Sequence, residues 1–130
     1  MNPEKKDYIS KWLFKANEDI AVIKQLTAEH PEIYTGAICF HAQQAVEKFL
    51  KTFLIFHDIE FAKSHDVDYL LNLCREVETS YFENLDLKSL ADFGVSIRYP
   101  DDFIIPELED ALIYKEIALK VKDIIELIID

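Results

Sequence analysis

Four side chains that can bind an anion fall on one edge of the helix predicted from about Tyr34 to His57. At about 100° per residue, His41, Gln44, Lys48 and Lys51 lie within about 80° of one another. Imidazole, amide and ammonium groups donate hydrogen bonds to phosphates or to a partner's carboxylates. Two interpretations stay open. The edge either lines a binding groove or is solvated, with Gln44 and Lys48 paired at about a few tenths of a kcal/mol.

A second candidate group is the segment RYPDD, residues 98–102. Pro100 disfavours helical geometry at Tyr99 and so ends a helix there. A guanidinium, a phenol and carboxylates, from Arg98, Tyr99 and Asp101, are thereby placed close together. They could bind a ligand. Alternatively, Arg98 interacts with the last carbonyls of its helix or pairs with Asp101.

The remaining reactive side chains lack the neighbours that catalysis or metal binding needs. His65, at the start of a predicted helix, is a secondary candidate, although an imidazole there more often caps or packs. Cys39 and Cys74 stand among apolar residues without a CxxC pattern, so we expect buried free thiols. P-loop, GxGxxG, HExxH and GxSxG patterns are missing. We therefore assign no catalytic residue, metal or cofactor.

Long helices must position these groups. Two glycines and four prolines leave few tight turns, and the apolar residues recur at steps of three and four. Three helices are predicted from about Glu4 to Ala28, Tyr34 to His57 and Asp66 to Glu78, with Ser64 as a possible cap of the third. A turn-like stretch, Thr79 to Asp86, follows.

Two further helices complete the prediction. The fourth is short and ends at RYPDD, with an inward face of Leu87, Leu90, Phe93 and Ile97. The last opens at Pro106 and Glu107. Three more apolar faces are predicted: Ile9, Trp12, Leu13, Ala16, Ile20 and Ile23 in the first helix; Ile38, Ala42, Ala45, Phe49 and Phe53 in the second; Ile113, Ile117, Val121, Ile124 and Ile128 in the last. Short connections favour an all-α, up-and-down bundle of about five helices.

Length and charge narrow the class of protein. The length of 130 residues suits a single domain, 1–130. Half of the residues are hydrophobic, but no apolar run reaches the length of about 20 residues that a membrane span needs. The N-terminus has no signal-peptide pattern, so we expect a cytoplasmic protein. The net charge of −11 repels phosphate backbones. A nucleic-acid partner would therefore need a local basic groove.

Four motifs follow one another along the chain: Trp12, Ala16, Asp19 and Ile20, then QQAVEKFLK at 43–51, then SHDVDYLL at 64–71, then RYPD at 98–101. In this order they resemble the HEPN family over nearly the whole chain. The strongest part is QQAVEKFLK, which is similar to that family's second-helix signature. The resemblance implies a small helical bundle that commonly dimerises. Many such proteins are metal-independent RNases, others bind nucleotides without catalysis, and many are encoded beside a minimal nucleotidyltransferase.

One feature of that family is missing. In its RNase motif, four to six residues separate an arginine from the histidine that follows it. Arg98 is followed at those positions by Phe103, Ile104 and Ile105, and Arg75 by Ser80, Tyr81 and Phe82. Neither arginine therefore has the histidine for general acid–base cleavage. A substitute pair, with His41 or His65 approaching Arg98 in space, stays open.

Three hypotheses about function follow. The first is a non-catalytic, homodimeric binding module in a toxin–antitoxin-like system. Its groove, with His41, Gln44, Lys48 and Arg98, would accept a nucleotide, RNA or a minimal nucleotidyltransferase. The second is a diverged RNase toxin that uses Arg98 with an unorthodox histidine. The third is a purely structural helical dimerisation unit, whose polar edge is buried at the subunit interface.

Overall fold

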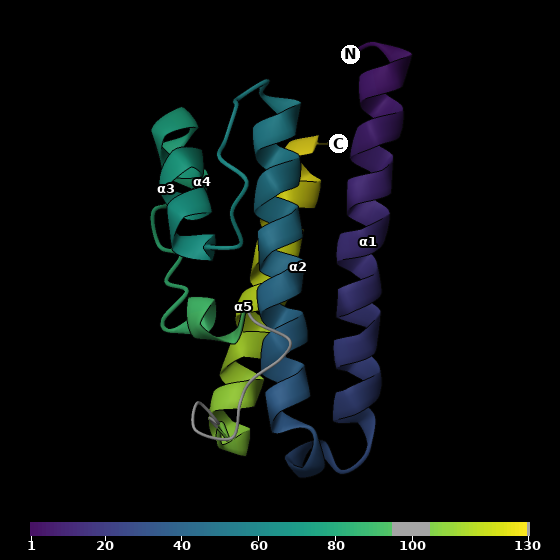
Figure 1. Cartoon of the computed structure of the whole chain (residues 1–130), viewed down its shortest axis with the longest axis vertical. Coiled ribbons are helices and arrows are strands. Elements are labelled where there is room, and N and C mark those ends of the chain that lie inside the picture. Colours follow the sequence, from purple (N-terminus) through teal and green to yellow (C-terminus); the bar gives the residue numbers. More distant parts are fainter. Residues whose placement is uncertain (95–104, 130) are drawn as a thin grey trace.

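The computed structural model of the protein describes residues 1–94 and 105–129 (Figure 1). This part of the chain contains the long helices α1 (Pro3–Ala28), α2 (Thr35–Phe56) and α5 (Leu108–Ile129) and the shorter α3 (Val67–Val77) and α4 (Thr79–Phe82). Two 3₁₀ turns, η1 (Pro31–Ile33) and η2 (Leu90–Phe93), complete it. The described residues form no strand, which confirms the all-α prediction.

Helix α2 is the central element of the bundle. It packs along α1 on one side and α5 on another, while α3 lies against it beyond the connection 57–66; α1 and α5 scarcely touch (Figure 1). The predicted core face of α2 is confirmed: Ile38, Ala42, Ala45, Phe49 and Phe53 are fully buried. Because neighbours surround it, α2 also buries polar side chains on its other sides. These polar side chains include the candidate site.

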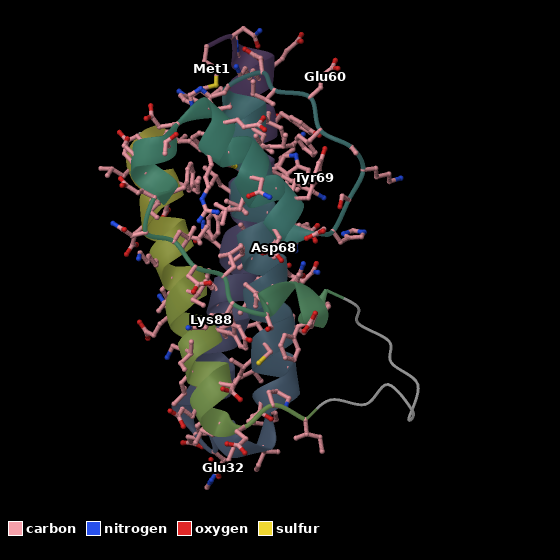
Figure 2. The ribbon with its side chains drawn as sticks, turned by 90° about the vertical axis from the view of Figure 1, so that its left-hand side faces the viewer. Met1, Glu32, Glu60, Asp68, Tyr69 and Lys88 are labelled. Carbon is pink, nitrogen blue, oxygen red and sulfur yellow. The ribbon has the colours of Figure 1, made fainter. Side chains whose placement is uncertain are left out.

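The entry to α3 differs slightly from the prediction. Asp66, not Ser64, caps the helix, since its side chain accepts from the backbone N–H of Asp68 at 2.9 Å and of Tyr69 at 3.4 Å. The Ser64 hydroxyl accepts from the N–H of Asp66 at 3.0 Å. Tyr69, seen in Figure 2, accepts at its hydroxyl from the N–H of Ala62 at 2.9 Å. The connection before α3 is therefore bound to the helix.

The predicted fourth helix was wrong. The turn-like stretch instead begins with the short helix α4, and the described residues that follow it, up to residue 94, contain the 3₁₀ turn η2 and no α-helix. A helix through Lys88 is prevented because this residue has φ 53°, and its N–H is bound by the Asp86 carboxylate at 2.8 Å. Leu87 and Leu90 are nevertheless buried as expected. Ile97 lies outside the described residues.

The apolar seam of α5 was only partly right. Ile117 and Val121 are buried, but Ile113 is exposed, and Ile124 and Ile128 are half-buried. The other buried positions of the helix are Ala111, Tyr114, Ala118 and Ile125. Apolar residues cover so much of the helix circumference that spacing alone permits more than one seam. The consequence is an apolar outer face on α5.

Candidate functional site

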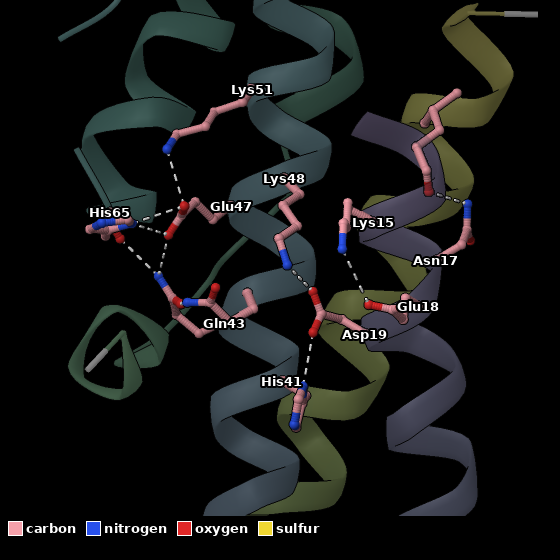
Figure 3. Close-up of polar contacts among 12 residues, drawn as sticks. Lys15, Asn17, Glu18, Asp19, His41, Gln43, Glu47, Lys48, Lys51 and His65 are labelled. Carbon is pink, nitrogen blue, oxygen red and sulfur yellow. Dashed lines mark hydrogen bonds and ion pairs between the residues drawn. The ribbon is translucent and has the colours of Figure 1, made fainter. Parts of the chain in front are cut away.

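A buried carboxylate, Asp19, joins α1 to the polar edge of α2. Its Oδ1 lies 2.8 Å from Nδ1 of His41, and its Oδ2 accepts from Nζ of Lys48 at 2.6 Å (Figure 3). Asp19 is only 7% exposed. Burial acts to raise the pKa of Asp19, but the hydrogen bonds and charges of His41 and Lys48 outweigh it and hold this pKa below its usual value. Asp19 is therefore ionised at neutral pH.

A second buried carboxylate, Glu47, joins α2 to the connection before α3. Its Oε2 accepts from Nζ of Lys51 at 3.1 Å, and Nδ1 of His65 lies 3.0 Å from the same oxygen (Figure 3). Gln43 donates to the backbone carbonyl of His65 at 2.8 Å. Glu47 is 4% exposed, whereas the His65 side chain is 74% exposed. The secondary candidate His65 is thus held at one ring nitrogen, with most of its ring in solvent.

The predicted polar edge is neither an open groove nor a freely solvated surface. Three of its four members contact buried carboxylates: His41 and Lys48 contact Asp19, and Lys51 contacts Glu47. Gln44 donates to Oε1 of Gln43 at 2.7 Å, so the loose Gln44–Lys48 pairing was wrong. His41 and Lys48 keep part of their surface accessible, while Lys51 is buried.

The third set of predicted residues, Arg98, Tyr99 and Asp101, lies outside the described residues. Its interactions, including any approach to a histidine, stay predictions. The last described residue before it is Gly94, which packs on α2. A β-carbon placed on Gly94 would lie 3.1 Å from Nε2 of Gln43. The first described stretch, residues 1–94, therefore ends beside the Glu47 interactions.

A hollow of about 400 Å³ lies where the first half of α1 meets α2. It is lined by Tyr8, Lys11, Trp12, Lys15 and Lys48, and we call it the lysine–aromatic hollow. The Tyr8 and Trp12 rings meet edge to face, with centroids 6.3 Å apart. Ring and methylene surfaces thus combine with ammonium groups.

Two of these ammonium groups have only exposed carboxylate partners. Lys11 Nζ lies 3.0 Å from Asp7, and Lys15 Nζ lies 3.9 Å from Glu18. Exposed pairs of this kind contribute roughly 0 to 1 kcal/mol, so either lysine can exchange its partner at little cost. Lys48 differs, because the buried Asp19 holds it in place.

The sequence also contains a signal for this hollow. Tyr8, Lys11, Trp12 and Lys15 follow one another at steps of three, one and three, which places them on one helix face. The prediction that Trp12 belongs to the core face of its helix is only partly right. Trp12 is only half-buried, with Nζ of Lys51 5.9 Å from its ring centroid. The roles of Asp19 and Glu47 as shared acceptors needed contacts between helices and could not be read from spacing.

The described part of the chain offers little support for a reactive thiol or a metal site. Cys39 and Cys74 are free and buried, and burial raises the pKa of each thiol to about 12, with Asp110 adding to the effect at Cys39. Such thiols are poor nucleophiles at neutral pH. Residues 1–94 and 105–129 hold no cluster of three or more potential metal ligands. Within the same ranges, no helix has the length and apolar character to cross a membrane.

Comparison with known proteins gives one match. The family model described as HEPN domain matches residues 9–129. This span covers α2 to α5, most of α1, and every residue of the two carboxylate networks and the hollow except Tyr8. No curated protein and no solved structure matches the chain significantly.

Proposed function

Because the chain belongs to the HEPN domain family, we propose that it is a non-catalytic binding module that takes a nucleotide in the lysine–aromatic hollow. One observation carries the proposal. On a chain of net charge −11, three lysines surround two aromatic rings in a single hollow. A local basic surface is what an acidic protein needs to bind a phosphate.

Each part of a nucleotide has a matching group in the hollow. A base has a flat apolar face that packs against aromatic rings, here Tyr8 and Trp12. Its phosphates are anionic and favour the ammonium groups of Lys11 and Lys15, whose present partners are weak. Lys48 supplies a third ammonium group, which Asp19 orients and whose charge it balances.

The histidine geometry also favours binding over catalysis. His41 and His65 each use Nδ1 to contact a buried carboxylate that has a lysine bound as well. Both residues therefore link elements of the fold to each other. Together with the absence of the Arg-x4–6-His motif from the sequence, this supports a module without RNase activity.

Calorimetry with ATP, AMP, adenosine and tripolyphosphate tests the proposal. We expect ATP to bind and both adenosine and tripolyphosphate to bind more weakly, because each lacks one of the two recognised parts. A double variant, Lys11→Ala with Lys15→Ala, should weaken ATP binding about tenfold, the effect of roughly 1.4 kcal/mol. The control Lys24→Ala removes an exposed lysine elsewhere on α1. If the double variant binds ATP as tightly as the control and the wild type do, the proposed location is refuted.

The assembly around this module is part of the same proposal. We propose a cytoplasmic homodimer that pairs with a minimal nucleotidyltransferase in a toxin–antitoxin-like system, as the family resemblance implies. Co-expression with the neighbouring gene's product, followed by co-purification, tests the pairing. Recovery of the chain alone would count against it.

A diverged RNase is the second candidate, because the contact between Asp19 and His41 is also compatible with a catalytic histidine. A carboxylate that holds Nδ1–H leaves Nε2 free to accept a proton, for example from a 2′-hydroxyl of RNA. RNA cleavage without added metal should then disappear in His41→Asn and persist in the control His57→Asn. Absence of cleavage by the wild-type protein excludes this candidate.

A further inference from the structure

Helix α5 carries an apolar outer face that the core of the bundle leaves uncovered. Leu112 is 38% and Ile113 36% exposed. The helix packs mainly on α2, and in Figure 2 its first half lies at the edge of the molecule. A hollow of about 460 Å³ lies on this face, lined by Glu109, Leu112, Ile113, Glu116, Ile117 and Lys120. The face is therefore large enough to accept side chains from another helix.

The residues along this face have an unusual order. Steps of four along α5, which form a surface ridge of a helix, give Leu108, Leu112, Glu116, Lys120, Ile124 and Ile128. All six are exposed or half-buried. The order of types is apolar, apolar, acidic, basic, apolar, apolar. If two copies of the ridge lie antiparallel, each apolar residue therefore meets an apolar residue and each charged residue meets one of opposite charge. The ridge is complementary to its own reverse.

We infer that this face of α5 binds α5 of a second copy of the chain in antiparallel orientation, about a two-fold axis that passes between Glu116 and Lys120 of the ridge. In that register Glu116 lies opposite Lys120 of the second copy, and Lys120 lies opposite its Glu116. On either side of these charged pairs, Leu112 of one copy meets Ile124 of the other. The contact is isologous, because each copy contributes the same patch.

The charges favour the antiparallel over the parallel orientation of a second copy. A parallel arrangement in the same register would place Glu116 against Glu116 and Lys120 against Lys120, and like charges repel. The antiparallel arrangement forms two opposite-charge pairs at the centre of an apolar patch. Ridges of this kind pack helices at about 50°, so contact concentrates on residues 112–124. The hollow on α1 and α2 uses no residue of α5. This inference therefore specifies the surface of the proposed homodimer but does not depend on nucleotide binding.

Sedimentation equilibrium of the full chain and charge-reversal variants tests the inference. Glu116→Lys and Lys120→Glu should each raise the dimer dissociation constant at least tenfold. The double variant, which exchanges the two charges, restores both pairs and should return within about threefold of wild type. Leu112→Asp should also dissociate the dimer, whereas Phe14→Asp changes a strongly exposed apolar residue of α1 and should not. Circular dichroism checks that each variant is folded.

The outcomes separate this inference from the proposed function. A wild-type dimer that tolerates both single reversals overturns the α5 surface and leaves the homodimer in place. A wild-type monomer at about 100 μM overturns both the surface and the homodimer, while the ATP titration still tests the hollow. Failure of the double variant to recover overturns the antiparallel register.

Discussion

At the scale of single residues, Asp19 connects stability to the candidate site. It is the shared acceptor of His41 and Lys48, and Lys48 lines the lysine–aromatic hollow. A carboxylate buried with two partners costs free energy if it loses either, because the remaining charge is poorly solvated. The same residue should therefore affect both the folding of α1 onto α2 and the position of Lys48.

Substitution of Asp19 should destabilise the protein in a pH-dependent way. Its pKa is lowered on folding, so its contribution is present above 3.8, the ordinary pKa of an aspartate, and is lost as pH falls through the folded pKa. Asp19→Asn should reduce the free energy of unfolding at pH 7 by about 2 kcal/mol. The difference from wild type should shrink below pH 4.

Urea denaturation at a series of pH values measures this effect. The matched control is Glu18→Gln, which neutralises the preceding, exposed carboxylate and should change stability by less than about 0.5 kcal/mol. Equal losses in the two variants at pH 7, or a loss for Asp19→Asn that persists unchanged into acid, would contradict this role of Asp19.

The residue types of the site could be predicted, but their partners could not. Periodicity placed His41, Gln44, Lys48 and Lys51 together, and the sequence of α2 alone fixes that arrangement. Which carboxylate each one contacts depends on how α1 and the connection before α3 approach α2. Lys48 contacts Asp19, 29 residues away, and His65 contacts Glu47, 18 residues away.

At the scale of elements, polar contacts as well as apolar packing hold the bundle around α2. The Glu47 interactions fasten the connection before α3, and η2 leads to Gly94, which lies against Gln43. Long helices could be predicted because their apolar period extends over many residues. The fourth helix could not, since a few apolar residues fit a 3₁₀ turn as well as a short helix.

The two glycines should respond to alanine with opposite signs. At Gly94 a β-carbon would meet Nε2 of Gln43 at 3.1 Å, and Gln43 is itself held by the carbonyl of His65. Gly94→Ala should therefore cost about 1 kcal/mol. At Gly36, in the first turn of α2, a β-carbon meets nothing within 4 Å. Gly36→Ala should stabilise by up to about 1 kcal/mol, through its higher helix propensity.

Denaturant midpoints of the two variants, measured beside wild type, provide the comparison. A midpoint that rises for Gly94→Ala would show that η2 does not pack on Gln43 as described. A midpoint that falls for Gly36→Ala would contradict the open space around the start of α2.

At the scale of the whole molecule, binding and assembly fall on different faces. The lysine–aromatic hollow uses α1 and α2, while the self-complementary ridge belongs to α5. The average charge of the chain argued against a phosphate ligand. Only the fold shows that Lys11, Lys15 and Lys48 share one hollow, because it brings α2 beside the first half of α1.

Trp12, the only tryptophan of the chain, lies in this hollow and reports on it directly. The most direct measurement is therefore the NMR signal of its single indole N–H during titration with ATP. We predict a saturable shift of this signal that weakens as salt is added and that Lys24→Ala leaves intact. If the indole signal stays in place while calorimetry shows ATP binding, ATP binds somewhere other than the hollow. A signal that stays in place without any binding would contradict the proposed function.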